Sequence, residues 1–202
     1  MKLKFWEFSL FVALVLAILW GALLERQQIA LAGQMVRLHV VAHSDGVADQ
    51  MLKHYVRDSV WAEVEPLLAA ATCRTEAEAT ITAHLSQITA AAGATIHDWG
   101  ADYPVQASLT WERHPTRVYE SFTLPAGRYH ALRIEIGEAR GHNWWCVVFP
   151  PLCMEVASGP DALEAAGLTE SEVALIAGSD QGYTVRFRAL ELVDGIRARI
   201  GR

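Results

Sequence analysis

The sequence predicts an α+β fold with a mainly antiparallel sheet and several covering helices, preceded by one N-terminal transmembrane or signal helix. Three observations support this fold class. A long apolar run lies near the N-terminus, segments with helical spacing follow it, and four strand-like segments then occupy much of residues 105–149. Because strands and helices are partly segregated along the chain, an α+β fold is favoured.

The N-terminal segment is predicted to direct export. Residues 8–24 form an uncharged apolar run of seventeen residues, just long enough to cross a bilayer as a helix. Lys2 and Lys4 precede this run, and positive charge on that side keeps the N-terminus in the cytoplasm while the rest crosses. We therefore expect residues 1–32 to be a signal peptide or signal anchor, and residues 33–202 to be a single exported α+β domain.

Cleavage of this segment stays open on the sequence. Ala30, Leu31 and Ala32 fit the small-x-small pattern of a cleavage site. Glu25 and Arg26, however, make an unusually polar approach to that site. A retained segment would anchor the domain to the membrane through its helix.

The charge of the chain argues against one class of partner. The 202 residues include 23 acidic and 17 basic side chains, which gives a net charge of −6. Such a surface repels the phosphate backbone of nucleic acids. We therefore expect no nucleic-acid partner.

A strand followed by two helices is predicted at the start of the domain. Residues 35–43 alternate in the manner of a strand with one buried face. Ser44 or Asp45 can then cap a helix whose apolar residues recur at three and four positions, and Pro66 should end or kink it. The next helix is expected to start at a capping box and to end at a glycine; the residues concerned are Thr75 with Glu78, and Gly93.

Four strands are predicted next, at residues 105–112, 117–124, 128–136 and 144–149. The second and third should form a hairpin, because proline and glycine in the intervening Pro-Ala-Gly sequence favour a turn. The hairpin is expected to pack Phe122 and Leu124 against Leu132, Ile134 and Ile136. Further helices are expected at residues 161–166, 169–177 and 185–200.

The cysteines allow three interpretations. Cys146 could be a nucleophile beside a histidine, but its place after two tryptophans in an apolar strand favours an inert thiol. Cys146 and Cys153 could form a disulfide, because Pro150 and Pro151 force the strand out of the sheet and let the chain turn back. Two reduced, buried thiols are the third possibility. Cys73 is expected to be buried.

Neither a metal site nor a cofactor site is predicted. His39 and His43 are four residues apart on a strand, too far apart to act as a helical HxxxH pair. The sequence contains no HExxH, GxSxG, P-loop or GxGxxG motif. No catalytic residue is therefore assigned.

The aromatic stretch GHNWW remains to be explained. Trp144 and Trp145 should point to opposite faces of a strand, so both are buried only if each face is covered. An uncovered tryptophan would be a natural anchor for a binding partner. Core packing and recognition both stay open for this pair.

Two blocks of the chain resemble the stage II sporulation protein R family. One is RLHVVAHSDGVADQMLKHYVRDSV, at residues 37–60, and the other is LPAGRYHALRIEIGEARGHNWWCVVFPPLC, at residues 124–153. His43 departs from the asparagine that is common in the family at that position. Together the blocks cover about a quarter of the chain and follow an apolar leader.

This resemblance implies a signalling protein with no catalytic residue. It implies that the protein is made in the forespore and secreted into the space between the forespore and mother-cell membranes. There it would activate a membrane-embedded aspartic protease that processes the precursor of sigma factor E. We expect the partner-contact surface to comprise His39, His43, Ser44, Asp45, Asn143, Trp144 and Trp145.

Two alternatives differ in class from a signalling ligand. One is an exported thiol hydrolase that uses Cys146 with His142 or His130. The other is an anchored structural protein of the spore envelope. The first requires an accessible sulfur and the second a retained N-terminal helix.

Overall fold

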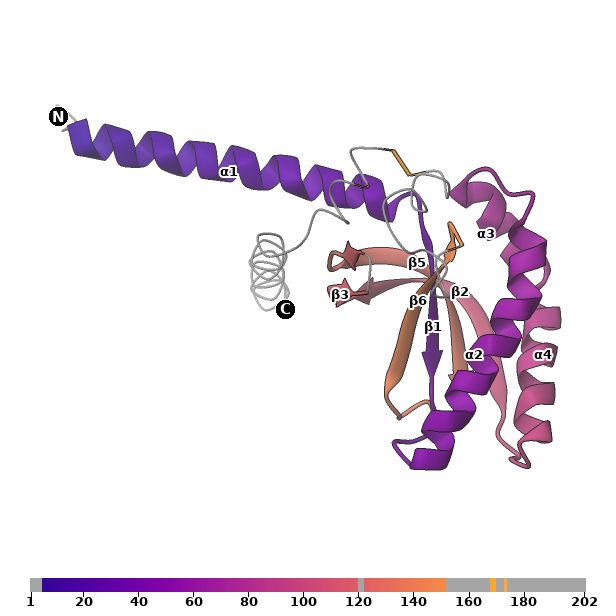
Figure 1. Cartoon of the computed structure of the whole chain (residues 1–202). Helices are drawn as coiled ribbons and strands as arrows, with labels where there is room; N and C mark the ends of the chain where they lie inside the picture. Colours follow the sequence, from indigo (N-terminus) through magenta and orange to yellow (C-terminus); the bar gives the residue numbers. More distant parts are fainter. Residues whose placement is uncertain (1–4, 120–121, 152–167, 170–172, 174–202) are drawn as a thin grey trace.

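The protein is built around a four-stranded sheet with helices packed on one of its faces (Figure 1). The computed structural model describes residues 5–119, 122–151, 168, 169 and 173. The strand order in the sheet is β2-β5-β1-β6, and β3 pairs with β4 in a separate ribbon. Along the chain the elements are α1 (Phe5–Ala32), β1 (Val36–Val41), α2 (Val47–Leu68), α3 (Arg74–Ala83), α4 (Leu85–Asp98), β2 (Val105–His114), β3 (Arg117–Val118), β4 (Thr123–Leu124), β5 (Gly127–Ile136) and β6 (Asn143–Phe149).

The sheet is mostly antiparallel. β2 pairs antiparallel with β5, and β6 pairs antiparallel with β1, whereas β1 and β5 run parallel. Parallel neighbours need a crossover between them, and the chain from α2 to β4 connects β1 to β5. The predicted mixed α+β class is confirmed, although the sequence did not indicate the parallel pair.

β1 lies inside the sheet and is buried on both faces, which corrects the prediction of one buried face. Leu38 and Val40 join the cluster beneath α2, α3 and α4. On the other face, Arg37 is 0% and His39 is 3% exposed. A second apolar cluster covers this face, and its members are Leu31, Met35, Phe122, Leu124, Val147, Leu168 and Val173. Polar groups on this side of β1 therefore need partners within the protein.

The stretch 117–124 forms a tight ribbon instead of one strand. β3 and β4 pair with each other, and the Tyr119 N–H donates to the Phe122 carbonyl at 2.8 Å. The predicted hairpin between this stretch and β5 is wrong, because β5 pairs with β2 and β1. The two expected halves of its inner face lie in different clusters: Phe122 and Leu124 in the second, and Leu132, Ile134 and Ile136 beneath the helices.

The helices also differ from the prediction in their ends. α2 continues through Pro66 for two more residues, and the second predicted helix is divided into α3 and α4 at His84. α4 runs past Gly93 to Asp98. The capping box is absent, because Cys73 is the N-cap residue of α3 and makes no side-chain cap bond. Cys73 is exposed, so the expectation of a buried thiol there is wrong.

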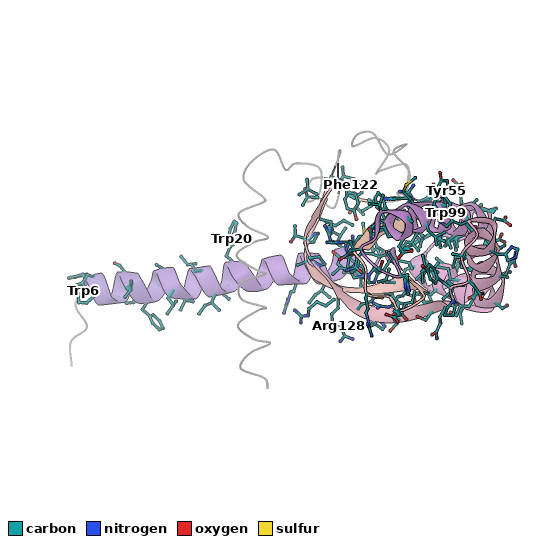
Figure 2. The ribbon with its side chains drawn as sticks, turned by 90° about the horizontal axis from the view of Figure 1, so that it is seen from below. Trp6, Trp20, Tyr55, Trp99, Phe122 and Arg128 are labelled. Carbon is teal, nitrogen blue, oxygen red and sulfur yellow. The ribbon has the colours of Figure 1, made fainter. Side chains whose placement is uncertain are left out.

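α1 projects away from the sheet and exposes apolar side chains. Phe5 is 94%, Leu10 is 66% and Trp20 is 60% exposed. Figure 2 shows Trp6 and Trp20 along the part of α1 that lies outside the domain. Within the described residues, no helix combines the length and apolarity needed to span a bilayer, so the predicted span at residues 8–24 is not confirmed. The helices predicted beyond Cys153 fall largely outside the described part of the chain.

Candidate functional site

The turn between β1 and α2 is held by the loop that precedes β6. Three main-chain donors of the loop reach the turn: Gly141 N–H bonds Ala42 O at 2.9 Å, Arg140 N–H bonds His43 O at 3.2 Å, and Glu138 N–H bonds His43 Nδ1 at 3.0 Å. We call these two segments, residues 42–46 and 137–142, the clasp. The clasp joins parts of the chain that are about a hundred residues apart in sequence.

Asp45 closes the clasp through its side chain. Its Oδ1 accepts a hydrogen bond from the His142 backbone N–H at 2.7 Å and lies 2.5 Å from Nδ1 of the same histidine. Lys53 of α2 adds a bond from Nζ to the His142 carbonyl at 3.1 Å. Burial lowers the pKa of Lys53, and the Asp45 carboxylate opposes part of that effect. Asp45 thus connects the turn to the loop, and Lys53 connects α2 to the loop.

Neither Ser44 nor Asp45 caps α2, which corrects the prediction. The N-cap residue is Gly46, and it makes no side-chain cap bond. Ser44 Oγ instead donates to Asp49 Oδ2 at 2.5 Å and accepts the Gly46 N–H at 3.1 Å. Both polar side chains therefore shape the turn.

Glycine is required at two places in the clasp. Gly137 has a φ of +58°, and a Cβ there would lie 2.2 Å from Nδ1 of His43. At Gly141, a Cβ would lie 2.2 Å from the Ser44 carbonyl oxygen. The loop can approach the turn this closely only without side chains at these two positions.

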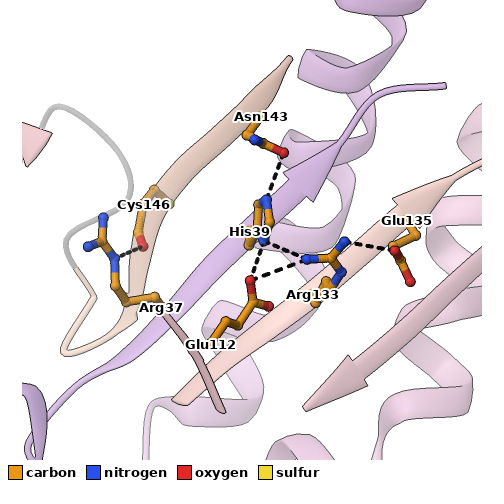
Figure 3. Close-up of polar contacts among 7 residues, drawn as sticks. All are labelled: Arg37, His39, Glu112, Arg133, Glu135, Asn143 and Cys146. Carbon is orange, nitrogen blue, oxygen red and sulfur yellow. Dashed lines mark hydrogen bonds and ion pairs between the residues drawn. The ribbon is translucent and has the colours of Figure 1, made fainter. Parts of the chain in front are cut away.

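A polar network lies next to the clasp, on the face of the sheet opposite the helices (Figure 3). His39 on β1 is 2.6 Å from Glu112 Oε2 through Nδ1 and 2.9 Å from Asn143 Oδ1 through Nε2. Arg133 on β5 lies 3.3 Å from the same Glu112 oxygen and 2.8 Å from Glu135. These contacts join all four strands of the sheet. They give both ring nitrogens of the buried His39 a polar partner, as buried polar groups need.

The two adjacent tryptophans point to opposite faces of β6, as predicted. Trp145 stacks on His39, with ring centroids 3.7 Å apart and an angle of 14° between the planes. Trp144 faces α2, where the Arg57 guanidinium lies 4.5 Å from its ring centroid. Both rings are partly buried, and their indole N–H groups have no hydrogen-bond partner in the described structure.

Arg37 and His114 form a second buried polar group beside Trp145. Arg37 donates from Nη2 to the Tyr119 hydroxyl at 2.6 Å, and its guanidinium lies 5.1 Å from the centroid of the Tyr129 ring. The His114 ring lies 4.3 Å from that of Trp145. Burial, followed by the positive charge of Arg37, lowers the pKa of His114 to about 2. His114 is therefore a neutral core residue at physiological pH.

The structure brings the predicted contact residues together at one end of the sheet, but they do not form one exposed surface. His39 is buried, and His43 and Ser44 are half-buried within the clasp. Asp45 and Asn143 are exposed. Trp144 and Trp145 are separated by the sheet. Asp45, Asn143 and the exposed His142 are thus the groups that a partner can reach there.

The cysteine prediction is only partly covered by the described residues. Cys146 is 2% exposed and takes part in a disulfide, whereas Cys73 is a free thiol. Cys153 lies outside the described residues, so the pairing of Cys146 with Cys153 stays a prediction. The two histidines considered as bases contact carboxylates: His142 contacts Asp45, and His130 contacts Glu78 at 2.7 Å.

The described residues contain no group of three histidine, cysteine or acidic side chains that could hold a metal ion. Sequence reasoning missed Glu112 and Arg133 as members of the site, and it named His142 only as a base for the thiol-hydrolase alternative. Glu112 and Arg133 lie on strands whose pairing the sequence did not reveal. A signal was present for His142, because it adjoins Asn143 within the GHNWW stretch.

Comparison with known proteins assigns the chain to a family. The family model for stage II sporulation protein R matches residues 32–158. The chain belongs to the stage II sporulation protein R family. A family member from Bacillus subtilis strain 168, stage II sporulation protein R, is 36% identical over 140 residues, which cover 69% of this chain and 62% of the relative. No solved structure matches the chain significantly. Membership of the stage II sporulation protein R family supports a role in sporulation.

Proposed function

We propose that this protein is an exported sporulation signal made in the forespore. In this proposal it enters the space between the forespore and mother-cell membranes and activates the membrane-embedded aspartic protease that processes the sigma factor E precursor. The observation that carries the proposal is membership of the stage II sporulation protein R family. The exposed apolar residues of α1 support export, because a signal peptide needs only seven to fifteen apolar residues.

The end of the sheet at the clasp is the proposed contact with the protease. Asp45 is the central candidate, because it is exposed and fixed by two contacts to His142. Fixed polar groups lose little side-chain entropy on binding. A ligand activates a protease only by binding its active state more tightly than its inactive state. Asp45 should therefore contribute to that difference in affinity.

Production of the protein with the protease and the sigma precursor in a non-sporulating host tests this proposal. The wild type should cause precursor cleavage, and its omission should abolish it. Asp45→Ala should reduce cleavage by about tenfold or more, as expected for a central contact residue. Glu65→Ala, an exposed carboxylate near the other end of α2, is the control and should be neutral. Absence of cleavage with the wild type would refute the proposed function.

A thermal melt and a second variant separate a role of Asp45 in partner contact from a role in folding. The thermal melt of Asp45→Ala should stay within a few degrees of the wild type, since the turn keeps its main-chain bonds. Asp45→Asn keeps an acceptor for the His142 N–H and removes only the charge. A large loss of melting temperature in Asp45→Ala would show that Asp45 serves the fold and not the partner.

A further inference from the structure

An exposed apolar stripe runs along the outer side of the helical layer. Val47, Met51 and Tyr55 are spaced four residues apart on α2 and are 79%, 47% and 50% exposed. Trp99, the C-cap residue of α4, is 39% exposed, and its ring lies 4.9 Å from that of Tyr55. Figure 2 shows Tyr55 and Trp99 side by side on the outside of the helices. We call these four residues the α2–α4 stripe.

The core does not account for the stripe. α2 already has a buried face that packs on the sheet, formed by Leu52, Val56, Val60 and Val64. The stripe is a second apolar edge on the same helix, and its α2 members are i, i+4 neighbours that lie next to one another on the helix surface. A contiguous exposed patch of this kind marks a binding surface more often than single exposed apolar residues do.

The stripe is also fixed in shape. Trp99 N–H donates to Thr95 O at 3.0 Å, and Gly100 N–H donates to His97 O at 2.8 Å, which closes the end of α4. Gly100 adopts a φ of +83° directly after the tryptophan, as the C-terminus of a helix favours. The tryptophan is therefore held at the surface by an ordered backbone.

Charges near the stripe indicate the chemistry of its partner. Asp98 adjoins Trp99 and its side chain is 84% exposed, and Asp102 is exposed three residues later. Asp58 is one turn from Tyr55, although Arg57 neutralises part of its charge. A second copy of the chain would place its own acidic residues against these carboxylates, and the two copies, each with a net charge of −6, would repel each other. A partner with apolar side chains and flanking lysines or arginines complements both features.

We propose that the α2–α4 stripe is the docking surface for a basic amphipathic segment of a partner protein. The inference rests on the proposed function, in which this partner is an extracytoplasmic segment of the protease. The apolar side chains of the segment cover Tyr55 and Trp99, and its cations face Asp98 and Asp102. The stripe begins two residues after Asp45, so one partner can contact the clasp and the stripe together.

A pair of matched substitutions tests the docking surface. Tyr55→Lys places a cation in the stripe, whereas Val118→Lys places one at an exposed apolar residue on the β3–β4 ribbon, where Val118 is 67% exposed. The probe is a synthetic helical peptide of leucine and lysine, with a leucine and glutamate peptide as its counterpart. The full-length wild type and Val118→Lys should bind the lysine peptide alike, and Tyr55→Lys about tenfold more weakly. The glutamate peptide should bind weakly to all three.

Equal binding of the lysine peptide by Tyr55→Lys and Val118→Lys, with both folded by circular dichroism, would overturn the docking surface. So would a wild-type dimer in sedimentation that Tyr55→Lys converts to a monomer, because a second copy would then occupy the stripe. In the cleavage assay, Tyr55→Lys should lose activity while Val118→Lys retains it. Cleavage that fails with the wild type refutes the proposed function, whereas the peptide result decides the stripe separately.

Discussion

Substitution of Gly141 by alanine should destabilise the protein through steric contacts with the turn between β1 and α2. The added Cβ would lie 2.2 Å from the Ser44 carbonyl oxygen and 2.9 Å from the Ala42 Cβ. The obstacle at Ser44 is backbone, so no side-chain rotation relieves it. The loop must move away from the turn, which stretches the 2.9 Å bond from Gly141 N–H to Ala42 O and the neighbouring bond from His142 to Asp45.

The expected cost combines two effects. Overpacking of a tight contact costs about 1–3 kcal/mol, and each weakened hydrogen bond costs about 1 kcal/mol. Partial relaxation of the loop limits the sum, so the free energy of unfolding should fall by about 2–3 kcal/mol. For a chain of this size, each kcal/mol lowers the melting temperature by about 2–4 °C.

Gly93→Ala is a matched control with the opposite sign. Its Cβ would lie 3.6 Å from Val105 Cγ1, an ordinary contact, within the interior of α4. Alanine is favoured over glycine in a helix by about 0.5–1 kcal/mol. Urea unfolding followed by tryptophan fluorescence should therefore rank Gly93→Ala above the wild type and Gly141→Ala well below it. Equal stability of Gly141→Ala and the wild type would refute the close approach of loop and turn.

Two further predictions concern the core. The folded pKa of His114 is about 2, below its unfolded value near 6.5, so the unfolded state takes up the proton first and stability falls as the pH drops from about 6.5 towards 2. Between pH 7 and pH 5 the wild type should lose about 2 kcal/mol of its free energy of unfolding, and His114→Phe should remove this loss. The control His97→Gln, at an exposed histidine, should leave the loss unchanged. Identical pH profiles for the wild type and His114→Phe would contradict the buried neutral ring. Cys146→Ser removes a disulfide and should lower the free energy of unfolding by about 2–4 kcal/mol. Under mild conditions the variant should still cause precursor cleavage. Complete loss of cleavage by a folded variant would favour the thiol hydrolase.

Much of the fold could be predicted because the signals are local. The alternation of residues 35–43 gave β1, and the spacing of apolar residues gave α2. The loss of main-chain donors at Pro150 and Pro151 gave the end of β6 at Phe149. In each case, the periodicity or a proline acts within a few residues of the position that it determines.

Errors arose where a side chain has a remote partner. Thr75 and Glu78 have the spacing of a capping box, but Glu78 contacts the remote His130 on β5 instead. Asp45 resembles a cap residue and bonds His142, which lies 97 positions later. A local pattern gives the possible roles of such a residue, and only the tertiary structure selects among them.

Prediction of the candidate site from the sequence was limited by the same dependence on remote contacts. The sequence pointed to His39 and Asn143, but their contact depends on the pairing of β1 with β6 across 104 positions. The role of Glu112 depends on β2 lying next to β5, a pairing that the predicted hairpin had assigned to another strand. Both faces of β1 are covered. The face that carries Arg37 and His39 suggested an exposed surface because it is polar, but it is buried in the structure.

The final turn of α1 belongs to the folded domain. Leu31 and Met35 are fully buried in the second apolar cluster, and Gly33 N–H still bonds Ile29 O at 2.9 Å. A peptidase that cuts behind Ala32 would take Leu31 away, and burial of a leucine stabilises a fold by about 1.5–3 kcal/mol. Cleavage after Ala32 would then have to occur before the domain folds, because Leu31 is buried in the folded protein. The cleaved protein would also lack the side chain that Leu31 contributes to the second apolar cluster.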